Sequence, residues 1–315
     1  MNALDGPGLR CIDRTVVTTD GVRLAVRDYP AAAEEVTAVL LHGFCLNQNS
    51  WNCQVHRLRQ RWGSRMRVIT YDHRGHGQSG DAPSHTYRVP TLAEDLDSVL
   101  AALHVSTPLV VIGHSMGGMT ALTFAGRPAA DQSVPPHGLV LVATAAGRLT
   151  ERGIGRLLAI PAVRALPALL GHVPDHLLRA LATPVCTELA RRRGCAPTAR
   201  DTLAAAAASA MASTPLATAV GFLAALRDYD AYPVLAAITA RTIIVSGGAD
   251  ALTPQSHAED LAAGIAGAVH VHLRGAGHML THDAPLAITD AIVRAANIPA
   301  AQTHSIHPVM ALAGA

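Results

Sequence analysis

The 315-residue sequence predicts an α/β protein whose mostly parallel, eight-stranded sheet is flanked by helices and carries a helical insertion. Three observations predict this fold class. Short β-rich runs alternate with helix-compatible stretches, as parallel strands joined by crossover helices require. Asp20-Gly21 separates the two earliest runs and is a strong hairpin signal, so the sheet begins antiparallel. The strand pattern stops between residues 147 and 233. The expected strands cover residues 15–18, 22–29, 36–41, 67–71, 109–112, 139–143, 241–246 and 269–273.

Two helices that cover the sheet can be placed from local signals. The segment from Thr91 to Glu94 has capping-box spacing, which predicts a helix start. Near the end of the chain, Asp283 and Pro285 indicate the cap and first turn of a last helix that reaches about residue 296. The apolar face of the first helix consists of Leu92, Leu96, Val99, Leu100 and Leu103.

The interruption of the strand pattern divides the chain into four parts. Residues 1–146 and 234–297 form the two parts of a core domain, 147–233 form a helical cap, and 298–315 form a tail without a convincing period. The cap segment is rich in Ala, Leu and Arg and contains many prolines, and a loop after a core strand can enlarge in this way without disturbing the sheet. The run 191–193, three arginines, is interpreted as a solvated face rather than an anion site. The apolar cap residues, expected mainly in the cap's own core, include Leu157, Leu158, Ile160, Leu169, Leu170 and Leu177.

Composition excludes several classes of function. The formal charge is only +2, which gives no electrostatic footprint for nucleic acid. The sequence contains no lysine, so Schiff-base chemistry and a phosphate-loop lysine are excluded. No window reaches the roughly 18 apolar residues of a membrane span and no secretory signal is visible, so the protein is expected to be cytoplasmic. The cysteines, scattered without metal-ligand spacing and expected to be reduced thiols, are Cys11, Cys45, Cys53, Cys186 and Cys195.

One pentapeptide carries the strongest chemical signal. Gly113-His114-Ser115-Met116-Gly117 follows an expected strand directly and precedes a helix-compatible stretch. A strand, a tight turn and a helix would expose the Ser115 hydroxyl above the sheet edge, with the flanking glycines accepting strained backbone angles. This context predicts a nucleophile elbow.

Two partners for a nucleophilic serine appear downstream at matching places. Asp250 follows the expected strand 241–246, and His278 ends the glycine-rich turn after the strand 269–273. Both lie at carboxyl ends of strands, where open α/β sheets place their sites. A serine hydroxyl needs a base to take its proton and a third group to orient that base, so the chain supplies a complete triad.

These residues and their order Ser115, Asp250, His278 make the chain resemble the α/β-hydrolase family over residues 15–296. The resemblance implies that Ser115 is the nucleophile, His278 the general base and then acid, and Asp250 the orienting carboxylate. Epoxide hydrolases and dehalogenases of this fold use an aspartate at the elbow, so the serine argues against them. The resemblance implies no cofactor and no metal.

The oxyanion hole and one further turn follow from the same resemblance. His42-Gly43-Phe44-Cys45 resembles the family's oxyanion loop, so the backbone amides of Phe44 and Met116 are the expected donors, with His42 bracing the turn. The stretch 75–80 matches the glycine pattern of the dinucleotide-binding motif, but residues 81–84 do not begin the helix whose N-terminus would bind the pyrophosphate. Residues 71–79 instead resemble a structural turn of the family, braced by Asp72.

The function expected is hydrolysis of carboxylic esters of small or medium apolar substrates, with a small molecule as the partner. Three alternatives remain at this stage. A cofactor-free haloperoxidase or perhydrolase and a carbon–carbon bond hydrolase use the same triad, and a ligand receptor could retain the triad without turnover.

Overall fold

A computed structural model describes residues 11–159 and 214–297 and contains an eight-stranded sheet in the order β1-β2-β4-β3-β5-β6-β7-β8. β1 pairs antiparallel with β2, and β2 with β4, whereas the remaining pairs are parallel. The predicted α/β fold and mixed sheet are therefore confirmed. The strands are β1 (Ile12–Val17), β2 (Arg23–Tyr29), β3 (Val36–Leu41), β4 (Met66–Tyr71), β5 (Leu109–His114), β6 (Pro136–Val142), β7 (Arg241–Gly247) and β8 (Val269–Leu273).

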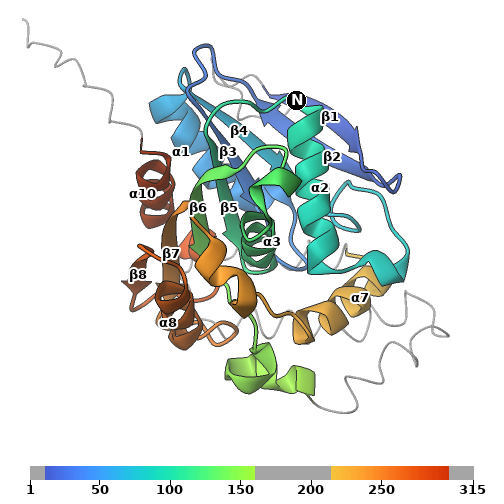
Figure 1. The fold of residues 1–315 in the computed structure, drawn as a ribbon, viewed down its shortest axis with the longest axis vertical. Coiled ribbons are helices and arrows are strands. Elements are labelled where there is room, and N and C mark those ends of the chain that lie inside the picture. Colours follow the sequence, from blue (N-terminus) through green and yellow to red (C-terminus); the bar gives the residue numbers. More distant parts are fainter. Residues whose placement is uncertain (1–10, 160–213, 298–315) are drawn as a thin grey trace, which may run out of the picture.

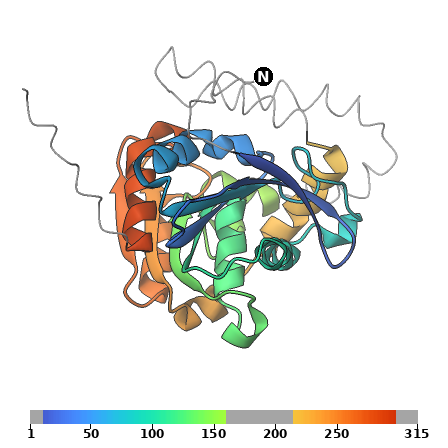
Figure 2. The ribbon, with the colours of Figure 1, turned by 90° about the horizontal axis from the view of Figure 1, so that it is seen from above.

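Helices cover both faces of this sheet (Figures 1 and 2). The central strands β3 and β5 are buried along their whole length, as strands covered on both faces must be. One face packs against α2 (Val89–Ala102), α3 (Met116–Ala125) and α8 (Gln255–Gly264), and the other against α1 (Asn52–Trp62) and α10 (Pro285–Ala296). The side chains of β3 alternate accordingly, since Val39 and Leu41 contact the first layer and Ala38 and Leu40 the second.

Two predicted helix starts are wrong in detail. α2 begins at Val89, with Pro90 in its first turn, so Thr91 lies inside the helix and caps nothing. A proline suits the first turn because its missing N–H would have no helical partner there. Asp283 does not cap α10 either, because it ends the short helix α9 (Leu280–Asp283) and its Oδ2 accepts a hydrogen bond from the Gly277 N–H at 3.0 Å. Pro285 does lie in the first turn of α10, as predicted. The predicted apolar face of α2 is correct, since all five of its leucine and valine residues are buried.

The described part of the expected cap consists of two short 3₁₀ helices, η4 (Leu149–Glu151) and η5 (Gly153–Ala159), and helix α7 (Leu216–Arg227). The ends of the segment lie side by side, because Gly147 and Asp230 form a β-bridge. The division into core and cap stays a prediction. The expected cap residues outside the described part are Ile160, Leu169, Leu170, Leu177 and the arginines 191–193, and the same holds for Cys186, Cys195 and the tail 298–315.

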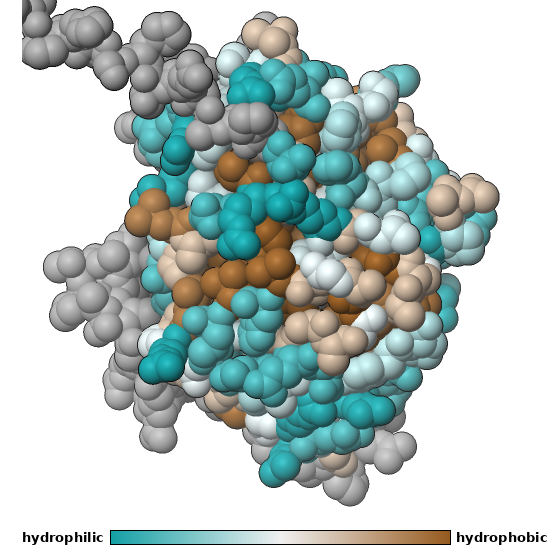
Figure 3. All heavy atoms as spheres, turned by 60° about the vertical axis from the view of Figure 1, so that its left-hand side comes forward, coloured by the Kyte–Doolittle hydropathy of each residue, from teal (hydrophilic) through white to brown (hydrophobic). Residues whose placement is uncertain are grey.

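α7 is joined to the core by an apolar cluster. Phe222 is fully buried against Tyr87, which precedes α2, and Met119 of α3 belongs to the same cluster. Elsewhere on the described surface, large apolar side chains are exposed at Val17, Val269 and Leu286. Figure 3 shows apolar patches among polar side chains on the face that it brings forward. None of the described helices combines the length and hydropathy needed to cross a membrane.

Candidate active site

Ser115 occupies the turn between β5 and α3 and has a backbone conformation that side-chain-bearing residues rarely adopt, with φ 53° and ψ −117°. Four hydrogen bonds hold its backbone there. The Ser115 N–H donates to the Val142 carbonyl at 2.9 Å. The Ser115 carbonyl accepts from the N–H groups of Gly118 at 2.9 Å and Met119 at 3.1 Å, and from the Thr144 hydroxyl at 2.7 Å. A strained residue persists only where its surroundings over-determine it, and strain of this kind is common at functional sites.

The glycines beside Ser115 serve a different purpose from the one predicted. Neither Gly113 nor Gly117 has a positive φ, so the strain falls on the serine itself. A Cβ on Gly113 would lie 2.2 Å from the Gly117 carbonyl oxygen, and a Cβ on Gly117 would lie 2.3 Å from the Leu41 carbonyl oxygen. Glycine is required at both positions because the backbones approach too closely for any side chain.

The structure brings Ser115, His278 and Asp250 together. His278 Nδ1 lies 2.8 Å from Asp250 Oδ2, and His278 Nε2 lies 3.1 Å from Ser115 Oγ. An ionised carboxylate can only accept, so Nδ1 donates and the lone pair of Nε2 faces the serine hydroxyl. His278 and Asp250 are both buried, whereas Ser115 is partly exposed. The arrangement can transfer a proton from the hydroxyl to the imidazole.

Asp250 accepts more hydrogen bonds than the one from His278. Its Oδ1 accepts from the backbone N–H groups of Leu252 and Thr253, and its Oδ2 accepts from the Thr253 hydroxyl at 2.7 Å. Burial acts to raise the pKa of Asp250, but the charge of His278 and these hydrogen bonds outweigh it, and the pKa is lowered. Asp250 is therefore ionised at neutral pH. Sequence reasoning missed Thr253, although Asp followed by Thr three residues later is a recognisable turn signal.

A second residue that sequence reasoning missed is His114, which precedes the serine. Its Nε2–H donates to the His278 backbone carbonyl at 2.9 Å, and its ring centroid lies 5.0 Å from that of His278. Burial, followed by the charge of His278, lowers the pKa of His114 to about 3, so the ring is neutral and helps to hold the loop that carries His278. A histidine at the end of a fully buried strand was the available signal.

Residues 42–45, the expected oxyanion loop, lie directly against the serine, since a Cβ on Gly43 would be 3.2 Å from Ser115 Cβ. The Gly43 carbonyl accepts hydrogen bonds from the Leu46 N–H at 3.1 Å and from His42 Nδ1 at 2.8 Å. The N–H of Phe44 belongs to the same trans peptide and therefore points in the opposite direction. Within the described residues, no hydrogen bond occupies the N–H of Phe44, and the N–H of Met116, the first residue of α3, has no acceptor within its helix. Both amides are available to a ligand.

His42 braces this loop as expected. Its Nε2 accepts from the His73 N–H at 2.9 Å, and burial lowers the pKa of His42 to about 4, so the ring is neutral. Asp72 braces the neighbouring turn, because its carboxylate accepts from the backbone N–H groups of Gln48 and Gln78. Besides His278, the buried histidines of this region are His42, His73, His76 and His114.

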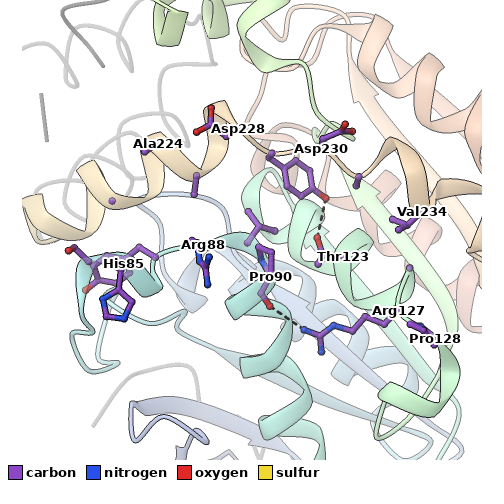
Figure 4. Close-up of a pocket in the computed structure, with 18 residues that line it drawn as sticks. His85, Arg88, Pro90, Thr123, Arg127, Pro128, Ala224, Asp228, Asp230 and Val234 are labelled. Atoms are coloured by element: carbon purple, nitrogen blue, oxygen red, sulfur yellow. Dashed lines mark hydrogen bonds between the residues drawn. The ribbon is translucent and has the colours of Figure 1, made fainter. Parts of the chain in front are cut away.

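A separate cavity of about 720 Å³ lies between α7 and the adjoining ends of α2 and α3 (Figure 4). Figure 4 shows Arg88 and Arg127 on the α2 and α3 side and Asp228 on α7. None of the predicted site residues lines this cavity. It is distinct from the serine site.

Comparisons with known proteins agree with the observed fold. The family model described as alpha/beta hydrolase fold matches residues 38–285. A solved hydrolase from Pseudomonas aeruginosa is 27% identical, with a TM-score of 0.72 over 94% of this chain and 100% of that one. An esterase from Exiguobacterium antarcticum has a TM-score of 0.74 over 91% of this chain and 100% of that one. Because it is only 24% identical, it shows the fold alone.

Curated relatives match over a shorter stretch. The sn-1-specific diacylglycerol lipase ABHD11 from Danio rerio is 35% identical over 108 residues, which are 34% of this chain and 32% of that protein. RutD from Caulobacter segnis, a protein named as a carbamate hydrolase, is 38% identical over 112 residues, which are 35% of this chain and 40% of that protein. The matched stretches thus span two fifths or less of these two relatives.

Proposed function

The chain belongs to the α/β-hydrolase family, and from that premise we propose that it is a hydrolase that cleaves carboxylic esters of small or medium apolar substrates through an acyl-enzyme. One observation supports this most strongly. The hydrogen-bonded series from Ser115 Oγ through the His278 ring to Asp250, at 3.1 and 2.8 Å, presents a hydroxyl next to a base whose tautomer is set.

In the proposed reaction, Ser115 Oγ attacks the ester carbonyl carbon while His278 Nε2 takes the hydroxyl proton. The carbonyl π bond opens to an oxyanion, which the N–H groups of Phe44 and Met116 stabilise. Removing one such donor from a serine hydrolase costs about 10² to 10³ in kcat. Asp250 stabilises the imidazolium that forms on His278.

The oxyanion then collapses, the carbon–oxygen bond to the alcohol breaks, and His278 gives its proton to the departing oxygen. A water molecule, deprotonated by His278, attacks the acyl group on Ser115 in the second half of the reaction. The acid leaves and the hydroxyl regains its proton. The two half-reactions use the same residues, so loss of either Ser115 or His278 stops both.

Neutral surroundings favour an uncharged substrate. Burial lowers the pKa of His42, His76 and His114, so these three rings carry no charge at pH 7. The apolar cluster that joins α7 to the core includes Met116 and Leu149, and Phe44 and Leu158 pack against it. Apolar surface near the nucleophile supports an apolar acyl or alcohol group.

Other chemistry on the same triad remains open to test. In perhydrolysis, hydrogen peroxide takes the place of water in the second half-reaction. In carbon–carbon bond hydrolysis, the substrate carries a carbon leaving group in place of the alcohol. The name of one relative describes carbamate cleavage. A receptor that has lost turnover is the alternative of a different class. A cytoplasmic location stays a prediction from the sequence.

The first experiment combines labelling with kinetics. A fluorophosphonate should label Ser115, and Ser115→Ala should lose both labelling and turnover of p-nitrophenyl esters by a factor of about 10⁴ or more. Ala224→Leu, placed in the separate cavity, is the matched control and should keep kcat/KM. If Ser115→Ala hydrolysed the esters at the wild-type rate, the proposed function would be wrong. If the wild-type protein itself hydrolysed them no faster than the uncatalysed background, the result would favour a ligand receptor.

The chain length of the acyl group tests the apolar site. Each buried methylene contributes about 0.8 kcal/mol, so kcat/KM should rise nearly fourfold per carbon from acetate to a medium chain and then level off. Because Phe222 of α7 is buried in the core cluster, a cap variant should replace only residues 160–213 and retain α7. An unchanged profile in that folded, active variant would place selectivity in the core domain.

A further inference from the structure

The oxyanion loop contains a second strained residue, Cys45, with φ 55°. A residue other than glycine in this region costs about 1 to 3 kcal/mol unless its surroundings hold it. Cys45 follows Phe44 directly, so the conformation of Cys45 sets the path of the chain on one side of the proposed oxyanion donor. The contacts that hold Cys45 therefore bear on the direction of the Phe44 N–H.

The backbone N–H of Cys45 donates to His76 Nε2 at 3.2 Å. His76 Nδ1 lies 3.0 Å from the Arg74 carbonyl, which can only accept, so Nδ1 carries the proton and the Nε2 lone pair faces Cys45. Burial lowers the pKa of His76 to about 3. The ring therefore stays neutral at working pH and keeps its acceptor.

The His76 ring is itself held by α7 of the cap segment. Its centroid lies 6.4 Å from that of Phe44 and 5.5 Å from that of the fully buried Phe222. α7 is anchored in turn at Thr218, whose hydroxyl donates to the Tyr87 hydroxyl at 3.0 Å. A continuous set of contacts thus joins the cap helix to the oxyanion loop.

We propose that His76 is a positioning residue of the oxyanion hole, which holds Cys45 in its left-handed conformation and is itself aligned by Phe222. The inference rests on the proposed function, because it requires that the Phe44 N–H binds the oxyanion. A buried N–H without an acceptor is unfavourable, so removing the acceptor lets this part of the loop rotate. A displaced donor is worth less than an aligned one, and the expected loss is about 10- to 100-fold in kcat.

Two substitutions separate hydrogen bonding from packing. His76→Phe keeps a ring between Phe44 and Phe222 but offers no acceptor to Cys45. His76→Gln loses the ring but places an amide oxygen near the position of Nε2. The proposal predicts that His76→Phe lowers kcat about 10- to 100-fold with KM within twofold, and that His76→Gln retains at least a third of kcat. Active-site titration with a fluorophosphonate gives kcat per competent site.

A third readout reports on the oxyanion directly. An alkyl trifluoromethyl ketone adds the serine hydroxyl and forms an oxyanion, so its affinity for His76→Phe should fall in proportion to kcat/KM. A role in packing alone predicts the reverse order, with His76→Phe as active as wild type and His76→Gln impaired, and that result would overturn the inference. If His76→Phe does not fold, His76→Gln decides alone, since a large loss of kcat there contradicts the proposal and near-normal kcat supports it.

Failure of this inference can be told apart from failure of the proposed function. Turnover retained in Ser115→Ala would remove the proposed function and this inference with it. An inactive Ser115→Ala together with wild-type kcat and ketone affinity in His76→Phe would remove only the role of His76.

Discussion

The backbone strain at Ser115 predicts that the Ser115→Gly protein is inactive and is more stable than the Ser115→Ala protein. Ser115→Gly and Ser115→Ala both delete the hydroxyl and its contact with His278, so their comparison cancels that loss. Only the Cβ differs between them. The backbone bonds to Val142 and Thr144 remain in both variants, because they involve the Ser115 N–H and carbonyl.

The size of the effect follows from two opposing terms. Relief of the strain at φ 53° and ψ −117° stabilises the glycine variant by about 1 to 3 kcal/mol. The greater freedom of glycine in the unfolded chain costs about 0.5 to 1 kcal/mol. Ser115→Gly should therefore be about 1 kcal/mol more stable than Ser115→Ala, or about 2 °C higher in Tm.

Equilibrium unfolding in urea, with the slope m compared between the two variants, measures this difference. An equal m shows that the denatured states are alike, so the midpoint reports stability. Turnover should be lost in both variants. If Ser115→Gly were about 1 kcal/mol less stable than Ser115→Ala, glycine would be showing only its ordinary cost, and the turn would store no strain.

Three further predictions concern the same site and its frame. Asp250→Asn should lower kcat about 10⁴-fold with little change in KM, measured on the best p-nitrophenyl ester, and a fully active variant would direct attention to another carboxylate. Gly117→Ala should prevent stable folding, because its Cβ would lie 2.3 Å from a backbone oxygen, whereas Gly275→Ala, with nothing within 4 Å, should melt like wild type. Three of the buried histidines have folded pKa values of about 3 to about 4, below the unfolded value of about 6.5, so the unfolded chain binds protons that the folded one excludes. Stability should fall by about 1.2 kcal/mol for each of them between pH 7 and 5.5. Asp72 and Asp95, whose pKa values burial raises, make an opposite contribution that reduces this loss. Urea midpoints that do not change with pH would contradict this prediction.

Much of the fold could be predicted from the sequence, because its signals are local. The eight β-rich runs match the eight strands to within a few residues, and Asp20-Gly21 forms the turn between β1 and β2, with Gly21 at φ 88°. The helix starts were less predictable, since the capping-box motif at Thr91 and the proline at residue 90 predict different first residues for α2, and the helix begins as the proline predicts. A local motif does not decide which of two neighbouring start signals the helix follows.

The candidate triad was also accessible from the sequence. Ser115, Asp250 and His278 each follow a strand, and parallel strands present their carboxyl ends at one edge, so chain order and strand position predict their proximity. The contacts that support the triad were not accessible. His114 bonds to a residue 164 positions away, and His76 bonds to one 31 positions away. No periodicity or spacing within either segment reports such a partner.

The sequence by itself determined the strands and the three residues of the candidate triad with their order along the chain, because each of these features depends on a few neighbouring residues. Only the tertiary structure decided why glycine is needed at Gly117, where the Leu41 carbonyl approaches from another strand, and that Ser115 rather than a glycine carries the strain. It also decided that α7 contacts the oxyanion loop through Phe222 and His76. These features depend on the distance between backbones far apart in the chain, which arises only when the sheet and its covering helices pack together.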